Sequence, residues 1–217
     1  MNEIYNIPKN NLNTLLDESI QSMYWVGFII ADGSIYDNFS RFELGLKNSD
    51  KDVLENFAKY INFDGTIKYR ELTNSNRIVF NNKKSIEKFS KHFGILENKT
   101  YNPINFELYE KYNEEQLLAL LIGIIDGDGH IEKNGSTNAF SIKITSHNCW
   151  ESFYEKLLTK LNINIHINPV KDKNTITIGI YKKDYIDKLV SIIINYNLYY
   201  LKRKWNIILQ KKKALAS

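Results

Sequence analysis

Two aspartates, Asp32 and Asp128, occupy the same position in two similar stretches of the 217-residue sequence. Each aspartate ends an apolar run and precedes a glycine, in the stretches YWVGFIIADGSI at 24–35 and LLIGIIDGDGHI at 120–131. Carboxylate oxygens are hard donors, and a pair of them can hold divalent cations such as Mg²⁺ or Ca²⁺. The chemistry that this pair could support is therefore metal-assisted hydrolysis.

The two apolar runs predict helices that pack directly on each other. Residues four apart share a face of a helix, and small side chains on that face let two backbones approach closely. The small residues at this spacing are Gly27 with Ala31 and Gly123 with Gly127. Such packing would bring Asp32 and Asp128 side by side at the helix ends. Gly33 and Gly129 stand at the C′ positions where a glycine commonly ends a helix.

This placement of Asp32 and Asp128 is electrostatically unfavourable. A carboxylate at a helix C-terminus faces the negative end of the helix dipole, at a cost of roughly 0.3–1 kcal/mol. Two carboxylates close together also repel each other. A structural role does not explain the arrangement, whereas bound divalent cations would offset the repulsion.

The segments that follow the two motifs also match, which indicates two similar halves. In each half an alternating stretch predicts a strand, and an amphipathic helix, a hairpin and another helix follow. The expected elements are strands at 40–46 and 140–145, helices at 50–61 and 148–161, hairpins at 66–80 and 164–181, and helices at 84–93 and 183–196. The predicted organisation is a first half at 1–100 with a polar extension at 1–18, a linker at 101–113 and a second half at 114–217.

The two motifs resemble those of the LAGLIDADG homing endonucleases. The nine letters of that motif align in frame with Trp25–Gly33 and with Leu121–Gly129. The second copy is close to the consensus, but the first has Ile30 where the consensus has an acid. Asp126 therefore has no partner in the first half, and we do not expect it to be essential to a symmetric mechanism.

The resemblance covers nearly the whole chain and implies an α+β fold. We expect two pseudo-symmetric αββαββα halves, with the motif helices packed at the centre and curved antiparallel sheets that form a DNA-binding saddle. The implied activity is that of a homing endonuclease, which hydrolyses one phosphodiester in each strand of double-stranded DNA and leaves short 3′ overhangs. The implied target is long and asymmetric, and the protein is expected to act as a monomer.

The resemblance also implies the residues that carry the reaction. Asp32 and Asp128 are the expected catalytic metal ligands, with Mg²⁺ as the cofactor and Mn²⁺ or Ca²⁺ able to occupy the same sites. No role is assigned to the backbone carbonyl at position 31. A basic residue is implied after the last helix of each half. Lys99 and Lys202 are the predicted pair, and Lys204 is the competitor in the second half.

Polar side chains on the predicted strands are the candidates for DNA contact, because a curved sheet can present them to base edges and phosphates. The first half supplies Arg41, Glu43, Lys47, Lys68, Arg70 and Arg77. The second half supplies Ser141, Lys143, Thr145, His166, Lys171, Lys173 and Thr177. The resemblance further implies a polar residue near the end of the second strand that touches metal-bound water. Counting from Phe42 and Phe140 gives Asn48 and Ser146.

The composition excludes several other classes of protein. The chain is 43% hydrophobic with a net charge of +4, which fits a folded protein and is weak evidence for a nucleic-acid partner. The single cysteine, Cys149, excludes an internal disulfide framework and a Cys-rich zinc site. We find no signal peptide, and the longest apolar runs are short of the roughly 20 residues that cross a bilayer. We expect an intracellular protein of the cytoplasm or an organelle matrix, with no membrane and no obligate protein partner.

Two alternatives on the same fold stay open. An RNA maturase that assists intron splicing would tolerate the loss of Asp32 or Asp128, and both are present. A DNA-binding module without cleavage activity would differ from the enzyme in a metal titration. An intein is disfavoured, because the sequence begins with Met and has no splicing residues at its ends.

Overall fold

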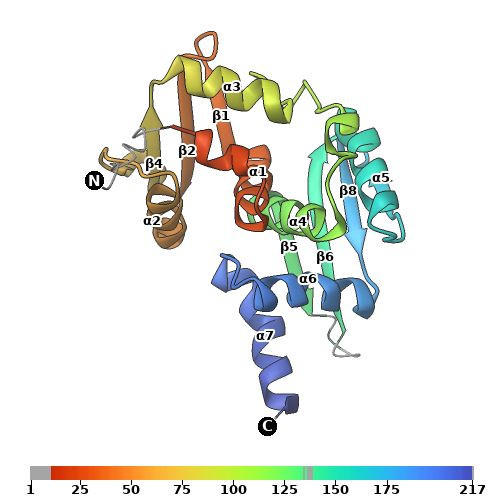
Figure 1. Ribbon diagram of the computed structural model, residues 1–217. Coiled ribbons are helices and arrows are strands. Elements are labelled where there is room, and N and C mark those ends of the chain that lie inside the picture. The colour runs from red at the N-terminus through yellow and green to blue at the C-terminus, as the bar shows by residue number, and fades with distance from the viewer. Residues whose placement is uncertain (1–10, 134, 136–138, 217) are drawn as a thin grey trace, which may run out of the picture.

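The computed structural model describes residues 11–133, 135 and 139–216, with side chains up to residue 210. Two helices, α1 (Ile20–Asp32) and α4 (Glu114–Asp128), pack against each other at the centre, and a four-stranded sheet lies on either side of them (Figure 1). The fold is α+β with two repeated halves, which confirms the predicted fold class. Among the described residues no helix is long and apolar enough to cross a membrane.

Both halves repeat one order of elements. After α1 come β1 (Gly33–Tyr36), β2 (Arg41–Lys47), α2 (Lys51–Tyr60), β3 (Lys68–Arg70), β4 (Ser75–Phe80) and α3 (Lys83–Phe93). After α4 come β5 (Gly129–Lys133), β6 (Phe140–His147), α5 (Glu151–Lys160), β7 (Ile167–Pro169), β8 (Thr175–Ile180) and α6 (Lys183–Asn195). Both sheets are antiparallel, with the matching strand orders β1-β2-β4-β3 and β5-β6-β8-β7.

The backbone pairing of the two sheets defines their equivalent positions. The defining pairs are Leu44 with Ile78 in the first sheet and Ile144 with Ile178 in the second, so equivalent residues differ by 100 in number. This register corrects the count from Phe42 and Phe140. Asn48 is equivalent to Asn148 and not to Ser146. The count failed because the second hairpin is longer, so that Phe140 pairs with Lys133 beyond the point where the first hairpin has turned.

The glycines in the middle of α1 and α4 lie where the two backbones are closest. A Cβ atom added to Gly27 would lie 2.0 Å from the carbonyl oxygen of Leu120. A Cβ atom added to Gly123 would lie 2.0 Å from the carbonyl oxygen of Tyr24. Any larger residue would push the helices apart, and the predicted packing through small residues is confirmed.

The glycines after the motif aspartates play a different role from the predicted one. Gly33 has a φ of −73° and Gly129 a φ of −90°, both extended, so neither ends its helix in a left-handed turn. A Cβ atom on Gly33 would lie 2.8 Å from the carbonyl oxygen of Ile29, and one on Gly129 would lie 2.6 Å from that of Ile125. Glycine is needed because each strand begins tightly against the last helical turn.

The predicted polar extension is partly built into the core. Residues 1–10 lie outside the described residues, but Asn13–Asp17 form a 3-10 turn in front of α1. Leu12 and Leu15 are fully buried, and the backbone N–H of Leu12 donates to the hydroxyl of Ser85 at 2.7 Å. The segment therefore ties α1 to α3.

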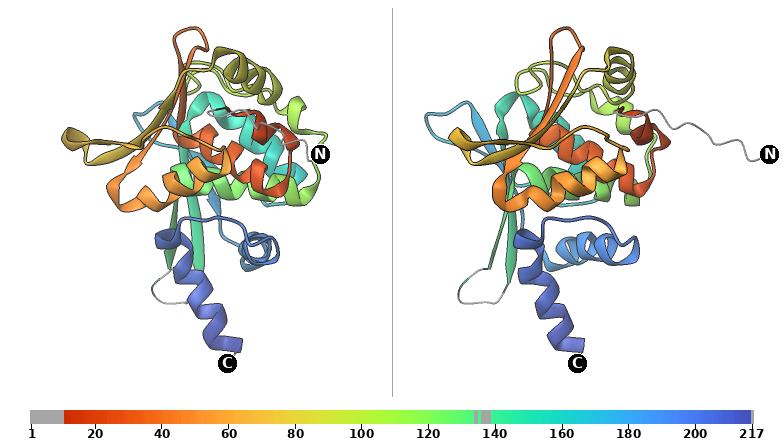
Figure 2. Two further views of the ribbon diagram at one scale, coloured as in Figure 1. Left: turned by 60° about the vertical axis from the view of Figure 1, so that its left-hand side comes forward. Right: turned by 90° about the vertical axis from the view of Figure 1, so that its left-hand side faces the viewer.

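The last helix, α7 (Lys202–Ala216), was not predicted. It follows α6 and projects from the body of the molecule (Figure 2). Its first turn is anchored, because Trp205 is fully buried and Lys204 is only 7% exposed. Residues 211–213, which are all lysines, belong to this helix.

Candidate functional site

Asp32 and Asp128 are the last residues of α1 and α4, and the packing of the two helices brings their ends together. A Cβ atom added to Gly127 would lie 3.1 Å from Oδ2 of Asp32. Burial and the neighbouring charge of Asp128 raise the pKa of Asp32 to about 6. Burial also raises the pKa of Asp128. The pair is therefore strained as two negative charges, and a bound cation would stabilise it.

Lys99 lies beside the motif aspartates, as predicted. Its Nζ donates to the backbone carbonyl of Ala31 at 2.5 Å, one residue before the end of α1. Burial lowers the pKa of Lys99, and the charges of the two motif aspartates partly oppose that shift. The indole N–H of Trp150 contacts the carbonyl oxygens of Lys99 and Thr100 at 3.0 and 3.2 Å, which holds this segment in place.

Lys204, and not Lys202, occupies the matching position in the second half. Its Nζ donates to three carbonyl oxygens in the last turn of α4, at 2.9 Å from Ile125, 2.6 Å from Asp126 and 3.1 Å from Gly127. Lys202 is exposed, and its Nζ lies 3.8 Å from the carboxylate of Asp52. Residues two apart point to opposite sides of a helix, so α7 can direct only one of the two lysines to α4. The prediction of Lys202 is therefore corrected to Lys204.

A cavity of about 280 Å³ opens beside Asp128. Its lining includes Lys99, Thr145, Ser146 and His147, so the structure brings Ser146 to the motif aspartate. Asn48 does not line this cavity. It is exposed, and its Oδ1 accepts a hydrogen bond from Asn76 at 2.7 Å. Of the two residues predicted to position water, only Ser146 shares a cavity with a motif aspartate.

The two sides of the site differ at the equivalent positions Asp50 and Trp150. Asp50 is only 4% exposed, and its carboxylate accepts from Arg203, with Nε to Oδ1 at 2.9 Å and Nη2 to Oδ2 at 2.8 Å. Near Lys204 this position carries the Asp50–Arg203 ion pair. Near Lys99 the equivalent position carries the indole of Trp150. Sequence reasoning missed Arg203, because nothing in the sequence links a residue of α7 to the end of β2.

Asp126 is fully enclosed and joins three helices. Its carboxylate accepts hydrogen bonds from the Tyr24 hydroxyl at 2.9 Å, the Leu201 backbone N–H at 2.8 Å and the Trp205 indole N–H at 2.7 Å. Burial raises the pKa of Asp126 to about 6, although these hydrogen bonds lower it in part. A role for Asp126 could be found only in the tertiary structure, because its partners are distant in sequence.

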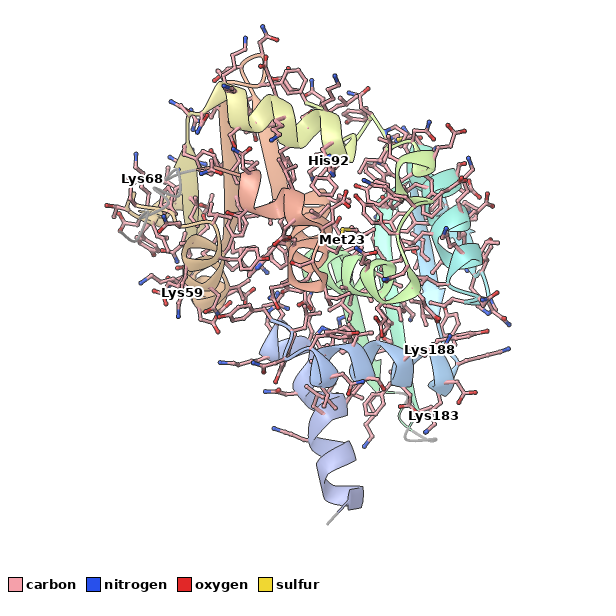
Figure 3. The ribbon with its side chains drawn as sticks, viewed as in Figure 1. Met23, Lys59, Lys68, His92, Lys183 and Lys188 are labelled. Atoms are coloured by element: carbon pink, nitrogen blue, oxygen red, sulfur yellow. The ribbon has the colours of Figure 1, made fainter. Side chains whose placement is uncertain are left out.

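The six contact residues predicted for the first half all lie on strands of the first sheet. Glu43 lies between two arginines, with Arg41 at 3.1 Å and Arg77 at 3.3 Å. The remaining residues of this set, Lys47, Lys68 and Arg70, are exposed. Lys68 lies on the hairpin at the outer edge of the sheet, away from Met23 at the centre of the molecule (Figure 3).

In the second sheet one of the predicted contact residues is buried. Ser141 is 1% exposed, and its hydroxyl donates to Glu132 at 3.0 Å, so Glu132 covers it. Lys143 lies 2.5 Å from the same carboxylate and stays partly exposed. Of the others, Thr145, His166, Lys171 and Lys173 are exposed and Thr177 is partly exposed.

The donor set at the helix ends fits a hard divalent cation. In the part of the chain that the structure describes, no three His, Cys, Asp or Glu side chains could hold a metal together. Asp32 and Asp128 therefore offer two carboxylates and leave other positions to water or substrate oxygens. Mg²⁺ accepts this arrangement, since it commonly binds one or two carboxylates and retains several waters.

Comparison with known proteins places this geometry in context. A family model described as a LAGLIDADG-like domain matches residues 19–94 and 115–193. The I-SmaMI LAGLIDADG homing endonuclease bound to cleaved DNA has a similar structure, with a TM-score of 0.61 and 15% identity over 89% of this chain and 88% of that chain. The I-LtrWI LAGLIDADG homing endonuclease bound to target DNA gives 0.56 and 15% over 88% and 87%. I-SmaMI bound to uncleaved DNA in the presence of calcium ions gives 0.57 and 16% over 89% and 92%.

No curated protein matches the sequence. At these identities the solved structures show a shared fold. The two matched segments each contain one motif helix and the sheet that follows it.

Proposed function

The chain belongs to the family of LAGLIDADG-like domains, and from this membership we propose that it is a metal-dependent endonuclease that cuts both strands of a specific DNA duplex. The observation that carries the proposal is the paired site at the ends of α1 and α4. Each helix ends in an aspartate, Asp32 or Asp128, and a lysine amine donates to a carbonyl just before it. Both helix ends therefore have an aspartate and a lysine.

The polar faces of the two sheets are the proposed DNA-binding surface. In the first sheet Arg41, Arg77 and Lys68 supply positive charge. Arg77 pairs with Gly45 there, and the equivalent pair in the second sheet is Thr177 with Thr145. Because the two faces present different side chains, we expect a target whose two half-sites differ in sequence. Both half-sites are recognised by one chain, so a monomer is the expected active form.

Phosphodiester hydrolysis requires an oriented water and stabilisation of the negative charge that develops on the phosphate. When bound, Mg²⁺ would supply Lewis-acid stabilisation of that charge. Asp32 and Asp128 would hold it, because their carboxylates are the hard donors at the helix ends. The ammonium groups of Lys99 and Lys204 would stabilise charge on the phosphate, since each is held by a helix carbonyl and cannot turn away into solvent.

The cavity beside Asp128 gives this side of the site a place for small groups. Thr145 and Ser146 line it together with Lys99. We propose that Ser146 orients a water molecule here, because a hydroxyl can both donate and accept a hydrogen bond. Its equivalent in the first sheet is Leu46, so the side near Asp32 must orient water through other groups.

The test is incubation of the protein with a library of random duplex DNA and Mg²⁺, followed by sequencing of the cut ends. We expect a single asymmetric sequence, with a break in each strand and short 3′ overhangs. A chelator should abolish the breaks. Specific binding without breaks would favour the DNA-binding module, and loss of both binding and breaks would contradict the proposal.

A further inference from the structure

We propose that Asp126 is a positioning residue that fixes the first turn of α7, so that Lys204 reaches the end of α4. This inference rests on the proposed nuclease function. It assigns a task to the motif acid that has no counterpart in the first half, where Ile30 stands at the same position of the motif.

Asp126 holds the start of α7 through two hydrogen bonds. Leu201 precedes the helix, and its carbonyl accepts the first backbone bonds, from Lys204 at 2.9 Å and Trp205 at 3.2 Å. The N–H of Leu201 has no partner within α7 and donates to Oδ2 of Asp126, while the Trp205 indole donates to Oδ1. The carboxylate also lies at the positive end of the α7 dipole, which favours its charge.

Lys204 lies in the same turn, between Leu201 and Trp205. Lys204 is 7% exposed, and its amine donates to three carbonyl oxygens at the end of α4. The reach of this amine depends on where the first turn of α7 lies. Because Asp126 holds the residues on both sides of Lys204, it sets that position.

The other lysine is held by a different group. Trp150 binds the carbonyls of Lys99 and Thr100 through its indole N–H, and no contact with Asp126 is involved. Lys99 and Asp128 line the same cavity, and none of the described residues of α7 lines it. Disturbing one anchor should therefore impair one lysine, and with it the cutting of one DNA strand.

The experiment uses the target duplex with each strand labelled separately. Lys204→Ala and Lys99→Ala first define which strand depends on which lysine. Asp126→Asn replaces one acceptor oxygen with an NH₂ group, which cannot accept from the N–H donors around it. We expect it to slow the Lys204-dependent strand by on the order of tenfold to a hundredfold, the scale of a displaced catalytic group, and to accumulate nicked product.

Three further variants sharpen the result. Trp205→Phe keeps an aromatic ring but removes the indole N–H, and it should slow the same strand as Asp126→Asn. Trp150→Phe should slow the opposite strand. Tyr109→Phe removes a buried hydrogen bond to the carbonyl of Phe93, away from α7, and should leave the ratio of the two strand rates unchanged.

Hydrogen exchange of the free protein gives a readout that does not need cleavage. In Asp126→Asn the amides of residues 201–205 should exchange faster, while those of α1 and α4 keep their protection. If the wild-type protein cuts no DNA, the nuclease proposal fails. The exchange pattern then still tests whether Asp126 fixes the first turn of α7. Equal slowing of both strands, or unchanged exchange at 201–205, would overturn the inference.

Discussion

At the scale of single residues, Asp32 and Asp128 lie where their charges are least favourable. Each is at the negative end of a helix and close to the other, and both have a raised pKa. A group that is kept in an unfavourable state is a candidate for function, because packing alone would not require it. The basic residues nearby, Lys99 and Lys204, do not remove the strain.

The first prediction concerns the two carboxylates. Asp32→Asn and Asp128→Asn should each lower the rate of double-strand cleavage by at least about a hundredfold, since each removes a metal ligand and roughly 2.7 kcal/mol or more of transition-state stabilisation. DNA binding without metal should survive. A plasmid-cleavage assay beside a gel shift measures both, and near-normal linearisation by Asp32→Asn would disprove the paired mechanism.

The second prediction concerns pH. The pKa of Asp32 is raised to about 6, so the folded protein binds this proton more tightly than the unfolded chain does. Its contribution to the free energy of unfolding should therefore fall as pH rises from about 4 to about 6, and Mg²⁺ should restore it above pH 6. Melting temperatures at pH 5 and 7.5, with and without Mg²⁺, test this. Asp32→Asn is the control, and it should show a smaller gain from Mg²⁺.

At the scale of elements, the close packing of α1 against α4 determines where the site lies. Gly27 and Gly123 allow each backbone to contact the other, and the chain passes from each helix directly into a strand. The end of each motif helix is therefore fixed on one side by its partner helix and on the other by its sheet.

The third prediction tests this packing. Gly123→Ala places a Cβ atom 2.0 Å from the carbonyl oxygen of Tyr24, so the helices must separate. The free energy of unfolding should fall by about 3 kcal/mol, the upper part of the usual range for overpacked cores. Gly45→Ala is the control, because its Cβ would have no neighbour closer than 3.8 Å. Urea unfolding measures both variants, and equal stability would contradict the role of the close approach.

At the scale of the whole molecule, two sheets of the same topology present different polar faces. The first carries arginines around Glu43, and the second carries Lys143 beside Glu132 with threonines nearby. α7 adds a further asymmetry, because Arg203 pairs with Asp50 of the first half while Lys204 binds α4 of the second. This helix thus connects the two halves at the site.

The fourth prediction concerns the DNA-binding surface. Affinity for the target should fall steeply with salt, because binding releases counterions from the phosphates. Lys68→Gln should reduce the slope of log K against log salt by about 0.9, the value for one lost phosphate contact. Lys59→Gln should leave the slope unchanged, because Lys59 is exposed on α2, whose apolar residues face the core. A titration series at several salt concentrations measures the slopes, and equal effects of the two variants would place the binding surface elsewhere.

The sequence by itself determined the repeat, the fold class, the pair of aspartates and the position of Lys99. These follow from local signals: helical spacing of small residues, alternation in strands, and a glycine after each aspartate. Each signal is contained within one element, so it can be read without knowing the partners of that element.

Only the tertiary structure decided between Lys202 and Lys204, placed Asp126 at the start of α7, and paired Asp50 with Arg203. These contacts join residues far apart in sequence, and their geometry depends on the angle at which α7 meets α4. The burial of Ser141 and the register that separates Asn48 from Ser146 were also hidden, because both depend on the length of the second hairpin. Local pattern specifies which residues share a face, whereas packing decides which of those faces meet.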